Sequence, residues 1–248
     1  MQKLLLVSSY LAILGLGFGG GFLNQKKVIP AQDYSIFSIQ PPSAVELRSL
    51  ASLKSILAPD KETVLEVTGD MALAHVNKVN ALPASFVPPN LTEIKGVKTF
   101  GKEYARADIL PFFFDLATDA QKSGYSLSVV SAYRSYFDQE KTFLNWVKSV
   151  GWEISSLVSA RPGHSEHQLG TTIDVGLSNP GFDTFRASPA ALWVEQNSWR
   201  FGFVVSYPKG KEQITGYVHE PWHLRWVGIE LATKLYQQEL TLEEYLSR

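Results

Sequence analysis

The sequence has no cysteine among its 248 residues. Disulfide bonds and thiolate metal sites are therefore excluded, so a bound metal ion would have to be held by nitrogen and oxygen donors. The sequence also has no large excess of charge of one sign: 23 Lys and Arg residues and 24 Asp and Glu residues give a formal net charge of −1. Nothing in this balance favours a nucleic acid or an anionic membrane surface as a partner. With 45% hydrophobic residues, the chain is long enough to bury one sizeable core in one or two domains.

Only the N-terminus carries a long hydrophobic run. It extends from Leu4 to Leu23 after Lys3 and is long enough to span a bilayer as a helix. We predict that residues 1–27 form an export signal or a membrane anchor, and the lack of a clear Ala-x-Ala cleavage site favours the anchor. Lys26 and Lys27 oppose the usual positive-inside bias, but large domains can be translocated regardless of such charges. We therefore expect the rest of the chain to lie outside the cytoplasm.

Residues 28–75 are interpreted as a stem. Gln40-Pro-Pro-Ser43 is typical of an extended linker, and apolar residues at helical spacing predict an amphipathic helix over 43–57. A folded domain is expected over 76–248, beginning with an irregular stretch at 80–90 that contains three prolines. The stem would then act as a spacer.

The domain is predicted to have an α+β fold with a mixed, mainly antiparallel sheet, because helical and strand-like patterns alternate along it. The same patterns predict flanking helices, with a metal site at the sheet. A hairpin is expected to return through 214–218. Hydrophobic periodicity predicts helices over 107–122, 138–150, 189–198 and 224–236, and strands over 127–132, 171–175 and 201–207.

Metal-capable side chains gather in two segments. Four of the five histidines fall between 164 and 223, and the first segment also carries Asp174. His167 and Asp174 are seven residues apart, so on one straight strand they would face opposite sides; we expect the chain to bend at Gly170. In the second segment, Glu220 precedes His223 by three residues and could act as a base. A lone histidine is more often solvated or bonded to a carbonyl, but the clustering favours a zinc site.

Several motifs in the same order resemble VanY-type D-alanyl-D-alanine carboxypeptidases, a family that includes L,D-carboxypeptidases of the LdcB type. The likeness extends from about Val76 to Gly228. Ala132 and Trp226 depart mildly from the family pattern without removing a functional group. The motifs are Ser131-Ala-Tyr-Arg-Ser135, Pro162-Gly-His-Ser-Glu-His-Gln-Leu-Gly170 with Asp174, Tyr207-Pro-Lys-Gly-Lys211, Ile214-Thr-Gly-Tyr217 and Glu220-Pro-Trp-His-Leu-Arg-Trp-Val-Gly228.

The resemblance implies a role for individual residues. One Zn²⁺ per chain would be held by His167, Asp174 and His223, with Glu220 as the catalytic base. Arg134 would face the carbonyl or carboxylate of the substrate. His164 matches no ligand of the family and is expected at the rim of the site. The further substrate-binding residues would be Ser131, Gln139, Ser165 and Trp222.

The implied activity is hydrolysis of the C-terminal D-Ala from peptidoglycan stem peptides, in the cell envelope. An L,D-carboxypeptidase or a peptidoglycan endopeptidase on the same scaffold is an alternative, because one sequence does not show the shape of the specificity pocket. A wall-binding module without catalysis is disfavoured, since both Glu220 and Arg134 are present. Arg134 could instead form an ordinary ion pair, and Glu220 could serve only to orient a histidine.

Overall fold

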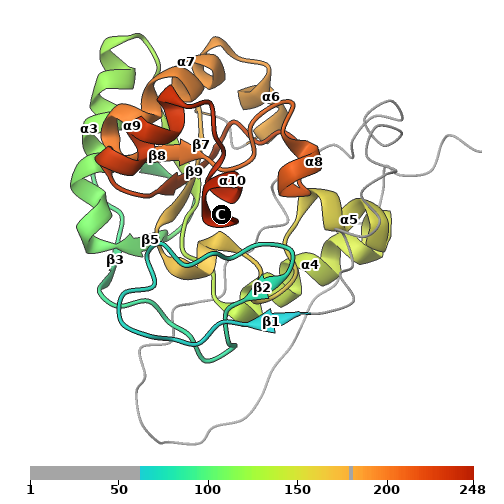
Figure 1. The fold of residues 1–248 in the computed structure, drawn as a ribbon. Helices are drawn as coiled ribbons and strands as arrows, with labels where there is room; N and C mark the ends of the chain where they lie inside the picture. The colour runs from blue at the N-terminus through green and yellow to red at the C-terminus, as the bar shows by residue number, and fades with distance from the viewer. Residues whose placement is uncertain (1–61, 179–180) are drawn as a thin grey trace, which may run out of the picture. The chain divides into compact units, whose positions relative to one another are not determined.

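A five-stranded mixed sheet lies at the centre of the fold (Figure 1). The computed structural model describes residues 62–178 and 181–248. The edge strand Lys98–Thr99 pairs with its neighbour in parallel, and the other three neighbouring pairs are antiparallel. The predicted α+β class with a mixed, mainly antiparallel sheet is therefore confirmed. In spatial order, the strands are β4 (Lys98–Thr99), β6 (Ser128–Ser131), β7 (Thr172–Gly176), β9 (His223–Trp226) and β8 (Phe203–Val205).

The sheet has one apolar and one polar face, because side chains alternate along its strands. Ile173 and Leu224 are paired across β7 and β9 and belong to the main hydrophobic core. This apolar face packs against α3 (Leu110–Lys122) and α7 (Pro189–Asn197), which lie together on one side of the sheet (Figure 1). The opposite face is left for polar side chains.

A β-bulge in β6 changes the face to which its last residue points. Val129 pairs with Val175 on the apolar side, but Ser131 pairs with Asp174 on the polar side. In a regular strand, residues two positions apart face the same side, so Ser131 would share the apolar face with Val129; the extra residue Val130 breaks this alternation. The bulge therefore delivers Ser131 to the polar face.

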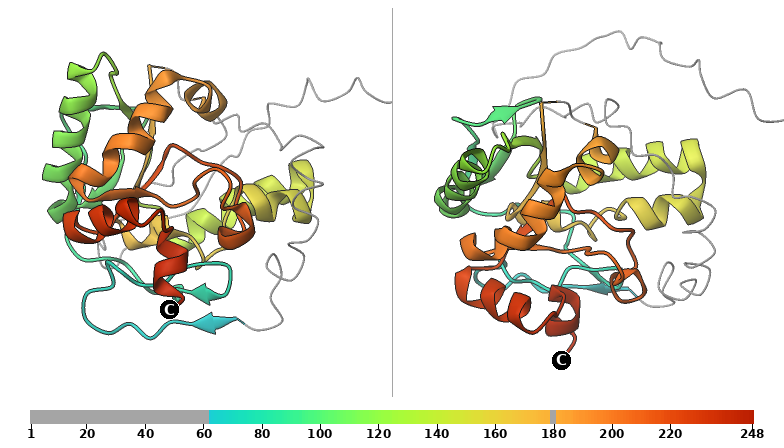
Figure 2. Two further views of the ribbon diagram at one scale, coloured as in Figure 1. Left: turned by 45° about the horizontal axis from the view of Figure 1, so that its top comes forward. Right: turned by 90° about the horizontal axis from the view of Figure 1, so that it is seen from above.

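The predicted helices over 107–122, 138–150 and 189–198 are confirmed. Ser135 accepts a hydrogen bond from the Asp138 backbone N–H at the start of α4, and Ser188 caps α7 in the same way. α4 and α5 lie side by side (Figure 2). The remaining helices are η3 (Ala107–Ile109), α4 (Tyr136–Val150), α5 (Trp152–Val158), η4 (Glu166–Leu169), α6 (Phe182–Arg186), η5 (Ser198–Phe201), α8 (Glu212–Thr215), α9 (Ile229–Gln237) and α10 (Leu242–Leu246).

The secondary structure predicted for the C-terminal part of the domain was wrong in two places. No strand of a hairpin returns through 214–218, because 214 and 215 belong to α8, which is followed by Gly216 with a φ of 76°. The partner of β8 is β9, which occupies the beginning of the stretch predicted as a helix over 224–236. Leu224 and Trp226 alternate with buried polar residues as a strand requires, and the helix begins only after Gly228.

The part of the predicted stem that the structure describes contacts the domain. β1 (Thr63–Val64) pairs in parallel with β2 (Asn80–Ala81). A two-strand antiparallel sheet follows, formed by β3 (Leu91–Glu93) and β5 (Tyr104–Arg106). The predicted segment 1–27 and helix 43–57 lie outside the described residues. Among residues 62–178 and 181–248, no helix has the length and apolar character needed to cross a membrane.

Gly170 gives a test of the bend between the two parts of the metal segment. Its φ is +70°, and a Cβ there would lie 2.9 Å from Pro88 Cγ and 3.1 Å from Leu91 Cδ2. We expect Gly170→Ala to lower the free energy of unfolding by about 2–4 kcal/mol, from backbone strain plus overpacking. Gly124→Ala is the matched control, since φ is +90° with open space around it, and should cost only about 1–2 kcal/mol of strain. Equal losses in urea denaturation would contradict the packing argument.

Candidate metal centre

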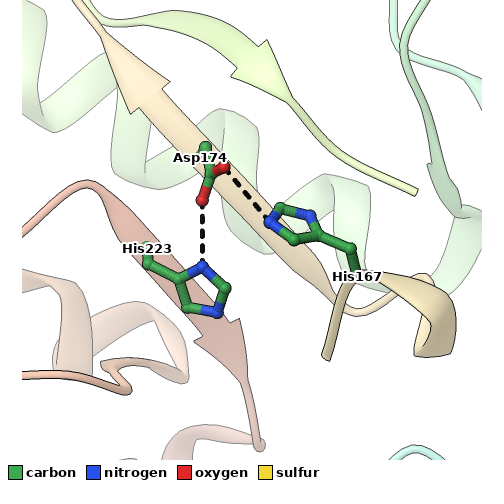
Figure 3. Close-up of side chains that lie close together, drawn as sticks. All are labelled: His167, Asp174 and His223. Atoms are coloured by element: carbon green, nitrogen blue, oxygen red, sulfur yellow. Dashed lines mark ion pairs between the residues drawn. The ribbon is translucent and has the colours of Figure 1, made fainter. Parts of the chain in front are cut away.

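His167, Asp174 and His223 form a buried cluster on the polar face of the sheet (Figure 3). One donor atom from each lies within 4.8 Å of the other two. Asp174 stands between the imidazoles, with its Oδ2 3.1 Å from His167 Nε2 and its Oδ1 3.1 Å from His223 Nδ1. The cluster joins three segments, since Asp174 is on β7, His223 begins β9 and His167 is in η4.

Local backbone structure explains how His167 reaches Asp174. The short 3₁₀ helix η4 ends at Gly170, whose left-handed conformation turns the chain into β7. The predicted bend at Gly170 is confirmed. His167 Nδ1 donates a hydrogen bond of 2.6 Å to the carbonyl of Ala132. This bond fixes the tautomer and leaves the Nε2 lone pair directed toward the cluster.

His223 is oriented by a carboxylate on its other side. His223 Nε2 lies 3.0 Å from Glu166 Oε2, which leaves Nδ1 facing Asp174. Glu166 also accepts a 2.6 Å hydrogen bond from Ser206 Oγ and lies 3.0 Å from Arg225 Nη1. Glu166, Ser206 and Arg225 were not predicted from the sequence. The available signal for Arg225 was a charged residue placed between two large apolar residues, Leu224 and Trp226.

The donor set fits a zinc ion. Two imidazoles and a carboxylate are three ligands of the kinds that catalytic zinc sites use, with a fourth position left for water or substrate. The buried Asp174 Oδ1 has no hydrogen bond of acceptable geometry to any described residue, although His223 Nδ1 is near. A cation held by these three residues would satisfy this oxygen.

Among the histidines of the cluster, His223 is the one whose charged form its neighbours favour. Burial disfavours its charged form, but contacts with the Asp174 and Glu166 carboxylates raise its pKa to about 10. Burial and the proximity of Arg134 lower the pKa of His167 despite Asp174. Burial opposes the charged form of Glu166 too, but Arg225 and His223 outweigh it and lower the pKa of this carboxyl to about 2. A proton on His223 Nδ1 therefore occupies the direction in which a metal would bind.

Glu220 lies beside the cluster. Its Oε2 is 3.9 Å from His223 Nδ1, and the His223 backbone N–H donates to the Glu220 carbonyl over 3.1 Å. The side chain is buried, and burial together with the charge of Asp174 raises its pKa to about 8. A positive ion in the cluster would favour the carboxylate form.

Arg134 is held immediately before α4. Its Nη1 donates to Gln139 Oε1 over 2.7 Å and its Nη2 donates to Ser131 Oγ over 2.8 Å. The Arg134 backbone N–H also donates to the carbonyl of His167 over 3.2 Å, which ties Arg134 to the metal segment. Ser131 and Gln139, predicted to bind substrate, are buried and contact the guanidinium.

Two other predicted substrate-binding residues are also buried. Trp222 is 1% exposed and stacks on Phe182 at a centroid distance of 4.6 Å, with Arg186 over its ring. It belongs to the main core and supports the turn between Glu220 and His223. Ser165 immediately precedes η4 and is 3% exposed.

The remaining histidines of the sequence cluster are paired elsewhere. His164 was expected at the rim but is 1% exposed; its Nδ1 donates to the Asn77 carbonyl over 2.7 Å. Its Nε2 lies 2.9 Å from Glu62 Oε2, which explains why it takes no part in the metal cluster. His219 Nε2 lies 2.6 Å from Glu195 Oε1.

Comparison with known proteins relates this site to one enzyme family. Residues 102–229 match the family model of VanY, D-alanyl-D-alanine carboxypeptidase. The YodJ protein of Bacillus subtilis (strain 168) is 36% identical over 224 residues, which cover 86% of this chain and 77% of that protein.

Solved structures agree with this match. The LdcB LD-carboxypeptidase superposes with a TM-score of 0.66 at 36% identity, covering 79% of this chain and 96% of the other. A mutant of the D,D-pentapeptidase VanY with Zn(II) gives 0.61 at 34% identity, with coverages of 71% and 98%. VanYB with D-alanine-D-alanine gives 0.60 at 34% identity, with coverages of 71% and 97%.

A histidine–aspartate–histidine centre on a mixed sheet, with a buried glutamate beside it, defines the class of zinc hydrolases to which these structures point. The chain belongs to the VanY D-alanyl-D-alanine carboxypeptidase family.

Metal binding should release protons. At pH 7 both Glu220, with a pKa of about 8, and His223, with a pKa of about 10, are mostly protonated without metal. Zinc needs the free His223 nitrogen and lowers the pKa of Glu220, so about two protons should leave per zinc bound. Calorimetry in two buffers that do not bind zinc and differ in ionisation enthalpy measures this number from the difference in enthalpy, and Glu220→Gln should release one proton fewer. Identical enthalpies in both buffers would contradict the assigned protonation states.

Proposed function

We propose that this protein is a zinc-dependent carboxypeptidase that removes the C-terminal D-Ala of peptidoglycan stem peptides. The observation that carries the proposal is the buried His167–Asp174–His223 cluster with Glu220 beside it, in a chain of the VanY family. VanYB, a structural neighbour, is known in complex with D-alanine-D-alanine. The catalytic domain of this proposal is 76–248, joined to the contacting segment 62–75.

When bound, zinc supplies Lewis acidity that lowers the pKa of water and polarises a carbonyl. Glu220 would accept the proton of the attacking water and pass it to the leaving amine. Burial raises the pKa of Glu220 and a neighbouring zinc ion would lower it, and the two effects together suit a base, which works best when its pKa lies near the operating pH. The 3.9 Å distance to His223 Nδ1 keeps Glu220 near the metal position without replacing a ligand.

Arg134 would bind the substrate through its guanidinium. Its contacts with Ser131 and Gln139 restrict its orientation before substrate arrives. A guanidinium so placed can stabilise a developing oxyanion or hold a terminal carboxylate. Ser131 and Gln139 would then act on the substrate by positioning Arg134, and Ser165 and Trp222 by fixing the backbone around the cluster.

An L,D-carboxypeptidase activity is the second candidate. The LdcB LD-carboxypeptidase aligns with this chain over 96% of its own length at a TM-score of 0.66. Both activities need the same zinc, base and arginine, and they differ in the stereochemistry of the residue before the scissile bond. An endopeptidase on this scaffold would require room beyond the C-terminal residue.

Action outside the cytoplasmic membrane follows from a peptidoglycan substrate. We place the enzyme in the cell envelope, either secreted or anchored through the hydrophobic run in residues 1–27. Only the stem before residue 62 would separate the domain from the membrane in the anchored form, because residues 62–75 contact the domain.

Stem peptides of two lengths separate the two candidate activities. The protein should be incubated with pentapeptides ending in D-Ala-D-Ala and with tetrapeptides ending in one D-Ala, and the products identified by mass. We expect loss of one D-Ala from the pentapeptide. Cleavage of the tetrapeptide alone would assign the L,D activity, and an intact pair of peptides with zinc-loaded protein would refute both.

Glu220→Gln tests the assigned base. The amide is nearly isosteric and leaves the three ligands unchanged, so the variant should fold and bind zinc while kcat falls by about 10²–10⁴-fold. Glu153→Gln, at an exposed position on α5, should keep parental turnover. Zinc content, peptide affinity and hydrolysis should be measured on one sample. A 10–100-fold loss of zinc affinity would instead indicate that Glu220 orients a ligand.

A further inference from the structure

The segment 62–82, here called the strap, is tied to the metal segment at several points. Glu62 contacts both Arg161 and His164 through Oε2, each at 2.9 Å. Leu82 donates a backbone hydrogen bond to Gly163 over 2.8 Å. These contacts occur beside η4, so the strap lies against the segment that carries His167.

One contact of the strap leads directly to the polar side chains behind the cluster. Arg225 on β9 has a fully buried side chain, and its Nη2 donates to the carbonyls of Ala72 over 2.7 Å and Ala74 over 3.3 Å. Its Nη1 lies 3.0 Å from Glu166 Oε1. The other oxygen of Glu166 lies 3.0 Å from His223 Nε2. An unbroken series of contacts therefore joins strap carbonyls to a candidate zinc ligand.

A planar guanidinium suits this connection because its donors are fixed in a fork. Nη1 and Nη2 of Arg225 approach partners that are more than ninety residues apart in the sequence, Glu166 and Ala72. If either partner moved, the guanidinium would turn with it and its contact with the other partner would change. Glu166 in turn determines which nitrogen of His223 faces Asp174.

The strap presents its carbonyls through a turn that Asp70 stabilises. Asp70 Oδ1 accepts a hydrogen bond from the Ala72 backbone N–H over 2.9 Å, and the carboxylate also pairs with Arg106. Arg106 has a second carboxylate partner in Asp108, which lies on η3 and outside the strap. Asp70 and Asp108 are both exposed, at 61% and 49% of their side-chain surface.

We propose that Arg225 is a positioning residue that couples the strap to the metal centre, so that residues 70–75 help to set zinc affinity through Glu166 and His223. The inference rests on the metal assignment within the proposed function. It differs from a purely structural role for Arg225, which would affect folding but leave the zinc affinity of the folded protein unchanged.

The first test measures zinc affinity of the full chain by competition with a chromogenic chelator, without substrate, on samples whose near-ultraviolet circular dichroism is native. We expect Arg225→Gln to weaken zinc binding by about 10–100-fold, the effect of losing a contact that orients a metal ligand. Arg225→Lys should fall between this variant and the parent, because the charge stays but the fork is lost. Parental zinc affinity in folded Arg225→Gln would overturn the proposal.

The second test acts on the strap alone and remains decisive if Arg225→Gln does not fold. Asp70→Ala and Asp108→Ala each remove one carboxylate from Arg106, but only the first also releases the Ala72 N–H. We expect Asp70→Ala to weaken zinc binding by at least about threefold, within the range of couplings inside one hydrogen-bond network, and Asp108→Ala to keep parental affinity. Equal zinc affinities in the two variants would overturn the coupling.

These measurements are separable from the test of the peptidase activity. A parental protein that binds zinc but leaves every stem peptide intact would refute the proposed function, while the affinity differences would still decide the role of Arg225. A parental protein without zinc affinity would overturn both.

Discussion

The pairing of β7 with β9 is the constraint on which the site depends. This register sets Asp174 opposite His223 and Ile173 opposite Leu224. If β7 shifted by one residue, its side chains would change faces, placing the Asp174 carboxylate in the hydrophobic core and Ile173 at the metal position. The burial of Ile173 and Leu224 against α3 and α7 therefore also secures the position of the polar cluster.

The polar face is buried as well, so its charges must be compensated within the protein. The structure does this in alternating order: Asp174 lies between His167 and His223, and Glu166 lies between His223 and Arg225. Each carboxylate thus has a cationic or hydrogen-bonding neighbour on both sides. These contacts restrict rotation of the His223 ring, so that Nε2 stays directed at Glu166 and Nδ1 at Asp174.

The candidate ligands and the sheet could be predicted because their signals are local. His167, Asp174 and His223 are recognised by residue type and by motifs a few residues long, and the core helices by their periodicity. The roles of Glu166 and Arg225 were missed because their partners are distant: Glu166 meets His223 across 57 positions and Arg225 meets Ala72 across 153. The burial of Trp222 was missed for the same reason, since its stacking partner Phe182 lies forty residues away in the sequence. β9 was mistaken for a helix because four residues are too few to display their alternation clearly.

The bulge in β6 has a consequence for what a short strand can contribute. Because Val130 is an additional residue in the strand, Val129 and Ser131 lie on opposite faces of the sheet. Val129 therefore packs in the apolar core, while the hydroxyl of Ser131, two residues later, holds Arg134. The bulge thus lets one short strand contribute both to the core and to the polar face at two positions that a regular strand would place on the same side.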